Sequence, residues 1–188
     1  MASTFRFVGG SISILLGALL LIGHIINLGV GTILGETMIL TSHLLMVFAF
    51  FVLYEAQSEE NSILGMFGML TGIIGTILVT AIVLVEIAGI SGASIDAVFA
   101  ANVPHAIHSF GPLLFVLGMI LFGISVARGT TLPRDGGYLL IIGTVIFAVA
   151  SLAGSAEDIF SVIGAIITGG GFIRLGLYLI KASPKEQN

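Results

Sequence analysis

Cysteine is absent from the sequence, and charged residues are scarce. Without cysteine the chain forms no disulfide, thiolate metal site or thiol nucleophile, and it binds no Cys-ligated iron–sulfur cluster. Asp, Glu, Lys and Arg make up only 9% of the 188 residues, and the net charge is −4. Because no basic patch is present, we expect no binding to nucleic acid. No Gly-rich loop precedes Lys-Ser or Lys-Thr, which argues against a nucleotide site.

The composition is that of an integral membrane protein. Hydrophobic residues make up 57% of the chain and its mean hydropathy is +1.20, far above the values of soluble globular domains. Apolar stretches long enough to cross a bilayer core of about 30 Å fill nearly the whole sequence. A soluble catalytic domain therefore has no room in these 188 residues.

Polar residues, glycine and proline divide the sequence into apolar stretches that predict transmembrane helices. We expect an all-α bundle of six membrane-spanning helices in a single transmembrane domain over residues 1–188, with spans at about 7–29, 37–55, 63–90, 103–127, 137–154 and 158–180. The connection 91–102 is expected to form a short helix at the membrane surface. The first apolar stretch is longer than the roughly 7–15 residues of a signal peptide, and no A-x-A site follows it, so we expect it to be retained.

The basic residues fall on one side of this arrangement. With six spans, both termini and the second and fourth connections share one face. The basic residues lie on that face or at helix ends beside it: Arg6, Arg128, Arg134, Arg174, Lys181 and Lys185. Because Lys and Arg are enriched on the cytoplasmic side of membrane proteins, we expect both termini in the cytoplasm. The first, third and fifth connections then lie outside the plasma membrane of a prokaryotic cell.

A short motif recurs in the sequence. Ile-Gly-Thr occurs at 74–76 and at 142–144, and a histidine, His43 or His108, lies near the start of the helix before each copy. This pattern predicts a duplication of the hairpins formed by spans 2–3 and spans 4–5. The two hairpins have the same orientation, so an axis along the membrane normal relates them.

Glycine is abundant, with 26 residues. Gly65, Gly68 and Gly72 follow a G-x-x-x-G-like spacing, and residues 169–171 are a run of glycines. In membrane proteins such small residues let helix backbones approach closely. These positions therefore predict helix contacts rather than a broken transporter helix.

The four histidines share one layer of the predicted bundle. They are His24, His43, His105 and His108, and each lies near the outer end of its span. Glu86 lies about one turn before the outer end of span 3 and joins the same layer. An ionisable group inside a span costs at least about 2.5 kcal/mol unless it is paired or hydrated. The layer is therefore a candidate functional site.

Haem b is our first hypothesis for this layer. Two imidazoles on facing helices are common axial ligands of haem in helical bundles, and His43 with His108 is the natural pair if the hairpins are duplicated. His24 and His105 then ligate a second haem or donate hydrogen bonds, and a magnesium chlorin is an alternative pigment. Nearby glycines at 23, 29, 111 and 118 leave room for a flat macrocycle. Such a protein transfers electrons to or from a quinone or an outer partner.

Other functions stay open. A zinc or copper site can be built from His24, His43, His105 and His108 with Glu86, in a metal-binding protein or small transporter. His105 and His108, three residues apart, share a helix face, but no H-E-x-x-H motif accompanies them and a hydrolase is disfavoured. Interfacial histidines also occur without any ligand. A non-catalytic accessory subunit of a larger membrane complex, or a homo-oligomer, is a further hypothesis, and the sequence does not decide whether the chain is an enzyme.

The overall pattern resembles small prokaryotic membrane proteins for which no activity is assigned. The likeness lies in a glycine-containing first span, in His43 opening a span that ends in LYEAQ at 53–57, and in a glycine-rich last span before a short basic tail. This resemblance implies a multi-pass membrane protein. It implies no activity.

Overall fold

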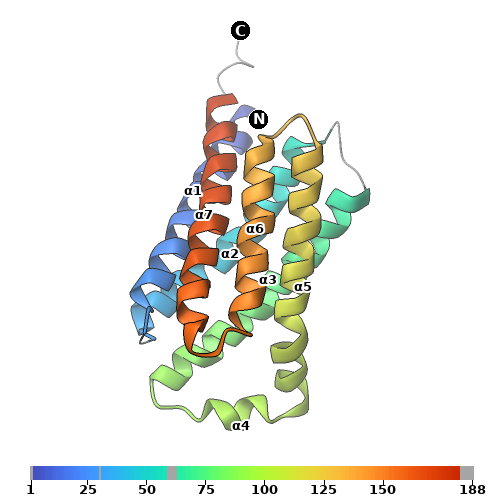
Figure 1. Cartoon of the computed structure of the whole chain (residues 1–188). Helices are drawn as coiled ribbons and strands as arrows, with labels where there is room; N and C mark the ends of the chain where they lie inside the picture. The colour runs from blue at the N-terminus through green and yellow to red at the C-terminus, as the bar shows by residue number, and fades with distance from the viewer. Residues whose placement is uncertain (1, 30, 59–62, 183–188) are drawn as a thin grey trace.

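The computed structural model describes residues 2–29, 31–58 and 63–182, and its regular elements there are helices (Figure 1). They are α1 (Ala2–Ile26), α2 (Ile33–Ala56), α3 (Ile63–Ile90), α4 (Ile95–Phe99), α5 (Asn102–Arg128), α6 (Arg134–Ala150), the short 3₁₀ helix η1 (Gly154–Ala156) and α7 (Glu157–Ala182). The predicted all-α class is confirmed for the described residues. The helix α4 lies in the connection where a short helix is predicted.

Within the described residues, five helices are long and apolar enough to cross a membrane. They span Thr4–Ile26, Ile33–Ala56, Ile63–Ile90, Asn102–Arg128 and Gly154–Ala182. The remaining long helix, α6, has only 17 residues and is not among them. The chain is therefore consistent with a multi-pass membrane protein, with five of the six predicted spans supported by length and composition.

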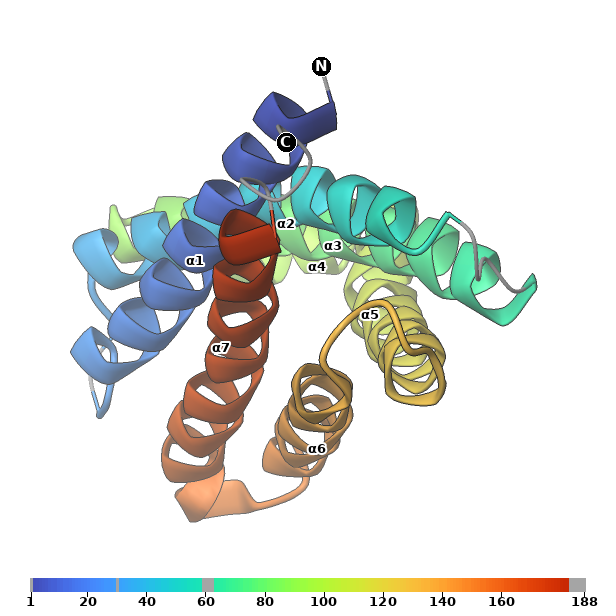
Figure 2. The ribbon, with the colours of Figure 1, turned by 90° about the horizontal axis from the view of Figure 1, so that it is seen from above.

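The long helices form a ring. Each packs against the next in the order α1, α2, α3, α5, α6, α7, and α7 packs against α1 to close the ring. Successive helices run in opposite directions, and seen from above α5 lies beside α3 whereas α6 lies beside α7 (Figure 2). The ring has two ends. We call the end with connections 27–32, 91–101 and 151–156 the cavity end, and the other the basic end.

Glycines bring neighbouring helices into backbone contact, as their spacing predicts. A Cβ on Gly118 of α5 would clash with the backbone of Gly72 in α3, and a Cβ on Gly72 would clash with the ring of Phe50 in α2. A Cβ on Gly169 of α7 would lie 2.5 Å from the carbonyl oxygen of Gly17 in α1. Gly170, by contrast, has no neighbouring atom within 4 Å of its Cβ position. The glycines at 72, 118 and 169 therefore set how closely the ring closes.

Large side chains fill the basic half of the ring. Phe50, Phe122 and Phe172 are fully buried, and the ring of Phe50 contacts the other two edge-on with centroid distances of 5.2 and 6.5 Å. Met46 and Met119 are equally buried beside them. This core closes the interior toward the basic end, so a cavity inside the ring cannot open there.

Charges are distributed unequally between the two ends. The described basic residues Arg6, Arg128, Arg134, Arg174 and Lys181 lie toward the basic end. Lys185 falls outside the described residues. Arg174 Nε lies 2.7 Å from Asp135 Oδ2, an ion pair that joins α7 to the first turn of α6. The cavity end contains carboxylates and histidines but no described Lys or Arg.

Candidate functional site, an acidic cavity at one end of the ring

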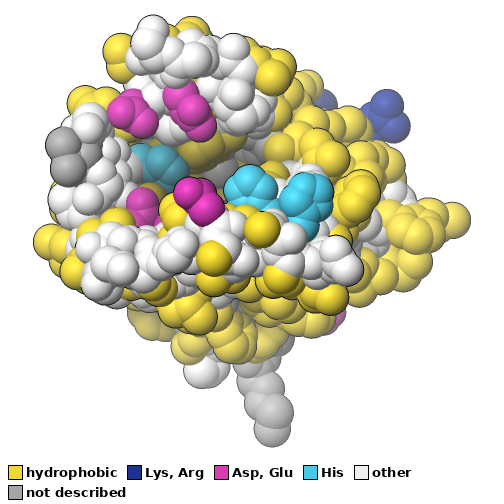
Figure 3. Space-filling model, turned by 90° about the horizontal axis from the view of Figure 1, so that it is seen from below, with side chains coloured by type: hydrophobic (Ala, Val, Ile, Leu, Met, Phe, Trp, Pro, Cys, Tyr) yellow, Lys and Arg dark blue, Asp and Glu magenta, His cyan; other side chains and the backbone are white. Residues whose placement is uncertain are grey.

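A cavity of about 680 Å³ lies inside the ring at the cavity end. Each long helix contributes to its wall, for example His24 from α1, Ile39 from α2, Val79 from α3, Val116 from α5, Phe147 from α6 and Val162 from α7. Viewed from this end, the molecule is hollowed, with histidine and acidic side chains around the hollow (Figure 3). The Lys and Arg atoms visible in this view lie at its margin. The cavity thus has one sign of formal charge.

His24 lines the cavity from α1, and its hydrogen bond fixes which ring nitrogen carries the proton. Nδ1 lies 2.9 Å from the carbonyl oxygen of Leu20, one turn earlier. Because a carbonyl only accepts, Nδ1–H donates and Nε2 keeps its lone pair when the ring is neutral. The ring meets Phe147 of α6 edge-on at a centroid distance of 5.1 Å. His24 therefore offers an acceptor or ligand atom in a partly apolar setting.

His43 lies deeper and is only 5% exposed. Its Nδ1 is 2.8 Å from Thr76 Oγ1 on α3, and its ring contacts Phe115 of α5 edge-on at 5.3 Å. The buried core begins about one turn further along α2, at Met46, whose Sδ lies 3.8 Å from the Thr76 hydroxyl. His43 and its neighbours thus form the floor of the cavity.

Glu36 is held in place by the connection between α1 and α2. Asn27 Nδ2 donates to Glu36 Oε1 at 2.7 Å, and Asn27 Oδ1 accepts from the backbone N–H of Thr32 at 2.9 Å. Thr32 in turn caps α2, because its hydroxyl accepts from Gly35 N at 2.9 Å. Gly29 turns the chain with φ +83°, which glycine adopts without strain. The carboxylate therefore has a fixed position at the mouth.

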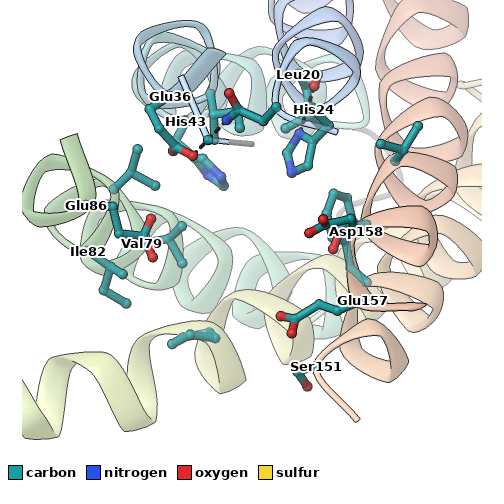
Figure 4. A pocket seen from close by; sticks show the side chains of 18 of the residues that line it. Leu20, His24, Glu36, His43, Val79, Ile82, Glu86, Ser151, Glu157 and Asp158 are labelled. Carbon is teal, nitrogen blue, oxygen red and sulfur yellow. Dashed lines mark hydrogen bonds between the residues drawn. The ribbon is translucent and has the colours of Figure 1, made fainter. Parts of the chain in front are cut away.

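Further carboxylates come from α3 and α7. Glu86 of α3 lines the cavity together with Glu36. Glu157 and Asp158, in the first turn of α7, line the opposite wall. In close view these four side chains and the two histidines face the same space (Figure 4). The site is thus rich in hydrogen-bond acceptors and negative charge.

The structure brings together three of the five residues predicted for the site. His24, His43 and Glu86 line the cavity. His105 and His108 do not, because both lie exposed on the first turns of α5. The ring of His108 instead packs on Phe99 of α4 at 4.5 Å. The pairing of His43 with His108 as ligands of one group is therefore not present in this arrangement.

The described residues contain no group of three or more His, Asp or Glu side chains arranged to hold one metal ion. The zinc or copper site accordingly stays a prediction. Three of the glycines expected to leave room for a macrocycle are occupied by helix contacts. A Cβ at Gly23 would meet Gly35, one at Gly111 would meet Leu78, and one at Gly118 would meet Gly72. Of these four glycines, Gly29 alone borders the cavity with open space at its Cβ position.

Glu36, Glu157 and Asp158 are site residues that the sequence interpretation does not identify. Each follows a polar connection and belongs to the first turn of a helix, where acidic residues are common. In the sequence each therefore indicates only the start of a helix. The sequence feature that could have identified them is the side of the membrane on which they are predicted to lie. All acidic residues of the first, third and fifth connections and their flanking turns lie on the same predicted face as the histidines.

The comparisons with known proteins give no relative: no protein-family model, curated protein or solved structure matches the chain.

Proposed function

We propose that the chain crosses the membrane six times, with both termini in the cytoplasm of a prokaryotic cell and the cavity open to the outside. At 1.5 Å per residue the 17 residues of α6 reach about 26 Å, close to the roughly 30 Å of a bilayer core. Its place in the ring between α5 and α7 supports a sixth crossing. The basic residues at the opposite end from the cavity support this orientation.

We further propose that the protein binds a small organic cation in the cavity. The observation that carries this proposal is that four carboxylates and two imidazoles line a space of about 680 Å³ with no Lys or Arg in its lining. A concave site lined by one sign of charge concentrates ligands of the opposite sign. The volume is typical of small-molecule sites, which range from about 300 to 1,000 Å³.

An organic ammonium fits this lining better than a bare metal ion. The side chains are spread around the wall rather than gathered as one ligand set, in line with the lack of a metal-holding group among the described residues. An ammonium group only donates hydrogen bonds, and Glu36, Glu86 and His24 Nε2 offer acceptors. Phe147 beside His24 provides an aromatic ring that attracts cations.

Haem b stays a prediction and receives less support from the same lining. Two histidines face the cavity, and the proton on His24 Nδ1 leaves Nε2 free for ligation. The propionates of haem, however, would meet carboxylates with no basic partner in the lining. Electron transfer with a quinone, and the role of an accessory subunit or homo-oligomer, likewise stay predictions. The absorption spectrum of the purified protein, oxidised and then reduced, tests the pigment directly.

Butylammonium is the probe that tests the cation site. Ligands that bind the folded state alone raise its apparent stability. We expect butylammonium to raise the midpoint of thermal unfolding, followed by circular dichroism in a non-ionic detergent. Butan-1-ol and butanoate, which match it in size but lack the positive charge, are expected to leave the midpoint unchanged.

Two matched substitutions locate the effect. Replacing both cavity carboxylates, Glu36→Gln with Glu86→Gln, should remove the rise given by butylammonium. Glu55→Gln, on the exposed face at the other end of α2, should leave it intact. An equal rise in all three proteins, or no rise in the unmodified chain, would refute an acidic cation site.

A further inference from the structure

The wall of the cavity between α5 and α6 differs chemically from the rest. Carboxylates line the cavity from α2, α3 and α7, whereas α5 contributes Pro112, Leu113, Phe115 and Val116, and α6 contributes Phe147 and Ala148, with Ser151 as its C-cap. In the ring order the α5–α6 boundary lies opposite the α1–α2 boundary, which carries His24, Glu36 and His43. The cavity thus has a polar, acidic side and an apolar side across from it.

The helices α5 and α6 are in close backbone contact toward the basic end. There, a Cβ on Gly137 of α6 would lie 2.7 Å from Ala127 N, and one on Gly123 of α5 would lie 3.0 Å from Gly137 O. Toward the cavity end α5 follows α3 instead, with Gly111 against Leu78. In the same region α6 follows α7, and a Cβ on Gly164 would lie 2.9 Å from Phe147.

Apolar side chains are exposed along the α5–α6 boundary toward the cavity end. Leu113 lines the cavity and is nevertheless 63% exposed, so it lies where the cavity meets the outer surface of the ring. Leu117, one turn further along α5, and Val149 on α6 are also exposed. In a bilayer this outer surface faces hydrocarbon. An opening beside Leu113 would connect the cavity to lipid between α5 and α6, in addition to its mouth at the cavity end.

We propose that the ligand of this cavity is an amphiphile with a primary ammonium head and a single alkyl tail, which enters from the outer leaflet between α5 and α6. The head lies among the carboxylates and the tail lies along Leu113, Val116 and Ala148. This inference rests on the proposed cation site, since the acidic side holds the head. It adds the class of ligand and its route of entry.

Alkyl chain length tests the proposal. Binding of butylammonium and octylammonium is measured by titration calorimetry on the full chain held in an amphipathic polymer, without detergent micelles. Each methylene group that leaves water favours binding, so we expect octylammonium to bind at least about tenfold more tightly than butylammonium. Octan-1-ol, which has the tail without the charged head, should bind far more weakly than octylammonium.

A substitution at the gap separates the two proposals. Leu113→Trp fills the boundary, so it should weaken octylammonium binding about tenfold, and more than it weakens the binding of butylammonium, whose shorter chain has fewer methylene groups to place along the apolar side. Leu84→Trp, at an exposed position of α3 outside the cavity lining, should change neither. If butylammonium binds but octylammonium binds no tighter, the amphiphile proposal is wrong while the cation site stands. The same holds if Leu113→Trp leaves octylammonium binding unchanged. If neither amine binds, the cation site itself is wrong and this inference fails with it.

Discussion

Thr76 on α3 holds the imidazole of His43 on α2, with Oγ1 lying 2.8 Å from Nδ1. The two side chains are 0% and 5% exposed, so water cannot replace this hydrogen bond. Thr144, in the second Ile-Gly-Thr motif, is equally buried, but its hydroxyl has no hydrogen-bond partner among the described residues. The two copies of the motif therefore place similar threonines in different surroundings.

Substituting these two threonines distinguishes a functional hydrogen bond from mere burial. Thr76→Val leaves Nδ1 of a buried histidine unpaired, so we expect the free energy of unfolding to fall by about 1–3 kcal/mol. Thr144→Val makes the same change in side-chain shape but removes a hydroxyl that has no partner among the described residues, so the free energy of unfolding should stay constant or rise. Unfolding in mixed micelles, followed by circular dichroism, gives both values. Equal losses in the two variants would contradict the pairing of Thr76 with His43.

The glycine contacts between α3 and α5 predict a second pair of outcomes. In Gly118→Ala the new methyl group meets the backbone of Gly72, which can yield only if the helices separate. Such overpacking costs about 1–3 kcal/mol. Gly170→Ala on α7 meets open space and should stabilise the helix by up to about 1 kcal/mol. Unfolding in mixed micelles measures both, and a Gly118→Ala variant as stable as the unmodified chain would show that the two helices are not in backbone contact.

Hydropathy was sufficient to predict the helices but not their rotation. The apolar stretch at 63–90 is predicted with the bounds that α3 has, because polar residues end it on both sides. The side of a helix that faces the ring is decided by packing between helices, which a uniformly apolar stretch does not reveal. His43 and His108 illustrate this limit. Both are predicted near the outer start of a span, yet His43 is buried at the cavity floor and His108 is exposed beside α4.

The site was predicted in part for the same reason. Glu86 is recognisable because a carboxylate inside an apolar stretch is costly. Glu36 is not, because it follows the polar connection that starts α2, and its role depends on Asn27 nine residues earlier. Only the fold brings that amide to 2.7 Å from the carboxylate. Glu157 and Asp158 reach the cavity because α7 closes the ring against α1, which no local pattern indicates.

The proposed topology can be measured directly because the chain has no cysteine. A thiol introduced by substitution is then the only site in this chain that a membrane-impermeant maleimide can label. Ser94→Cys lies in the exposed connection before α4, at the cavity end, and Ser58→Cys is exposed at the basic end. With the cavity outside, intact cells should label the first variant, and the second only after the membrane is permeabilised.

A third thiol decides whether α6 crosses the membrane. Ser155→Cys is exposed in η1, between α6 and α7. If α6 is the sixth span, this position lies on the same side as Ser94, and intact cells should label both to a similar extent. If α6 does not cross, Ser155 stays on the side of the α5–α6 connection and is protected like Ser58. Protection of Ser155 together with labelling of Ser94 would leave five spans, would place Glu157 and Asp158 on the cytoplasmic side, and would contradict a common acidic cavity open to the outside.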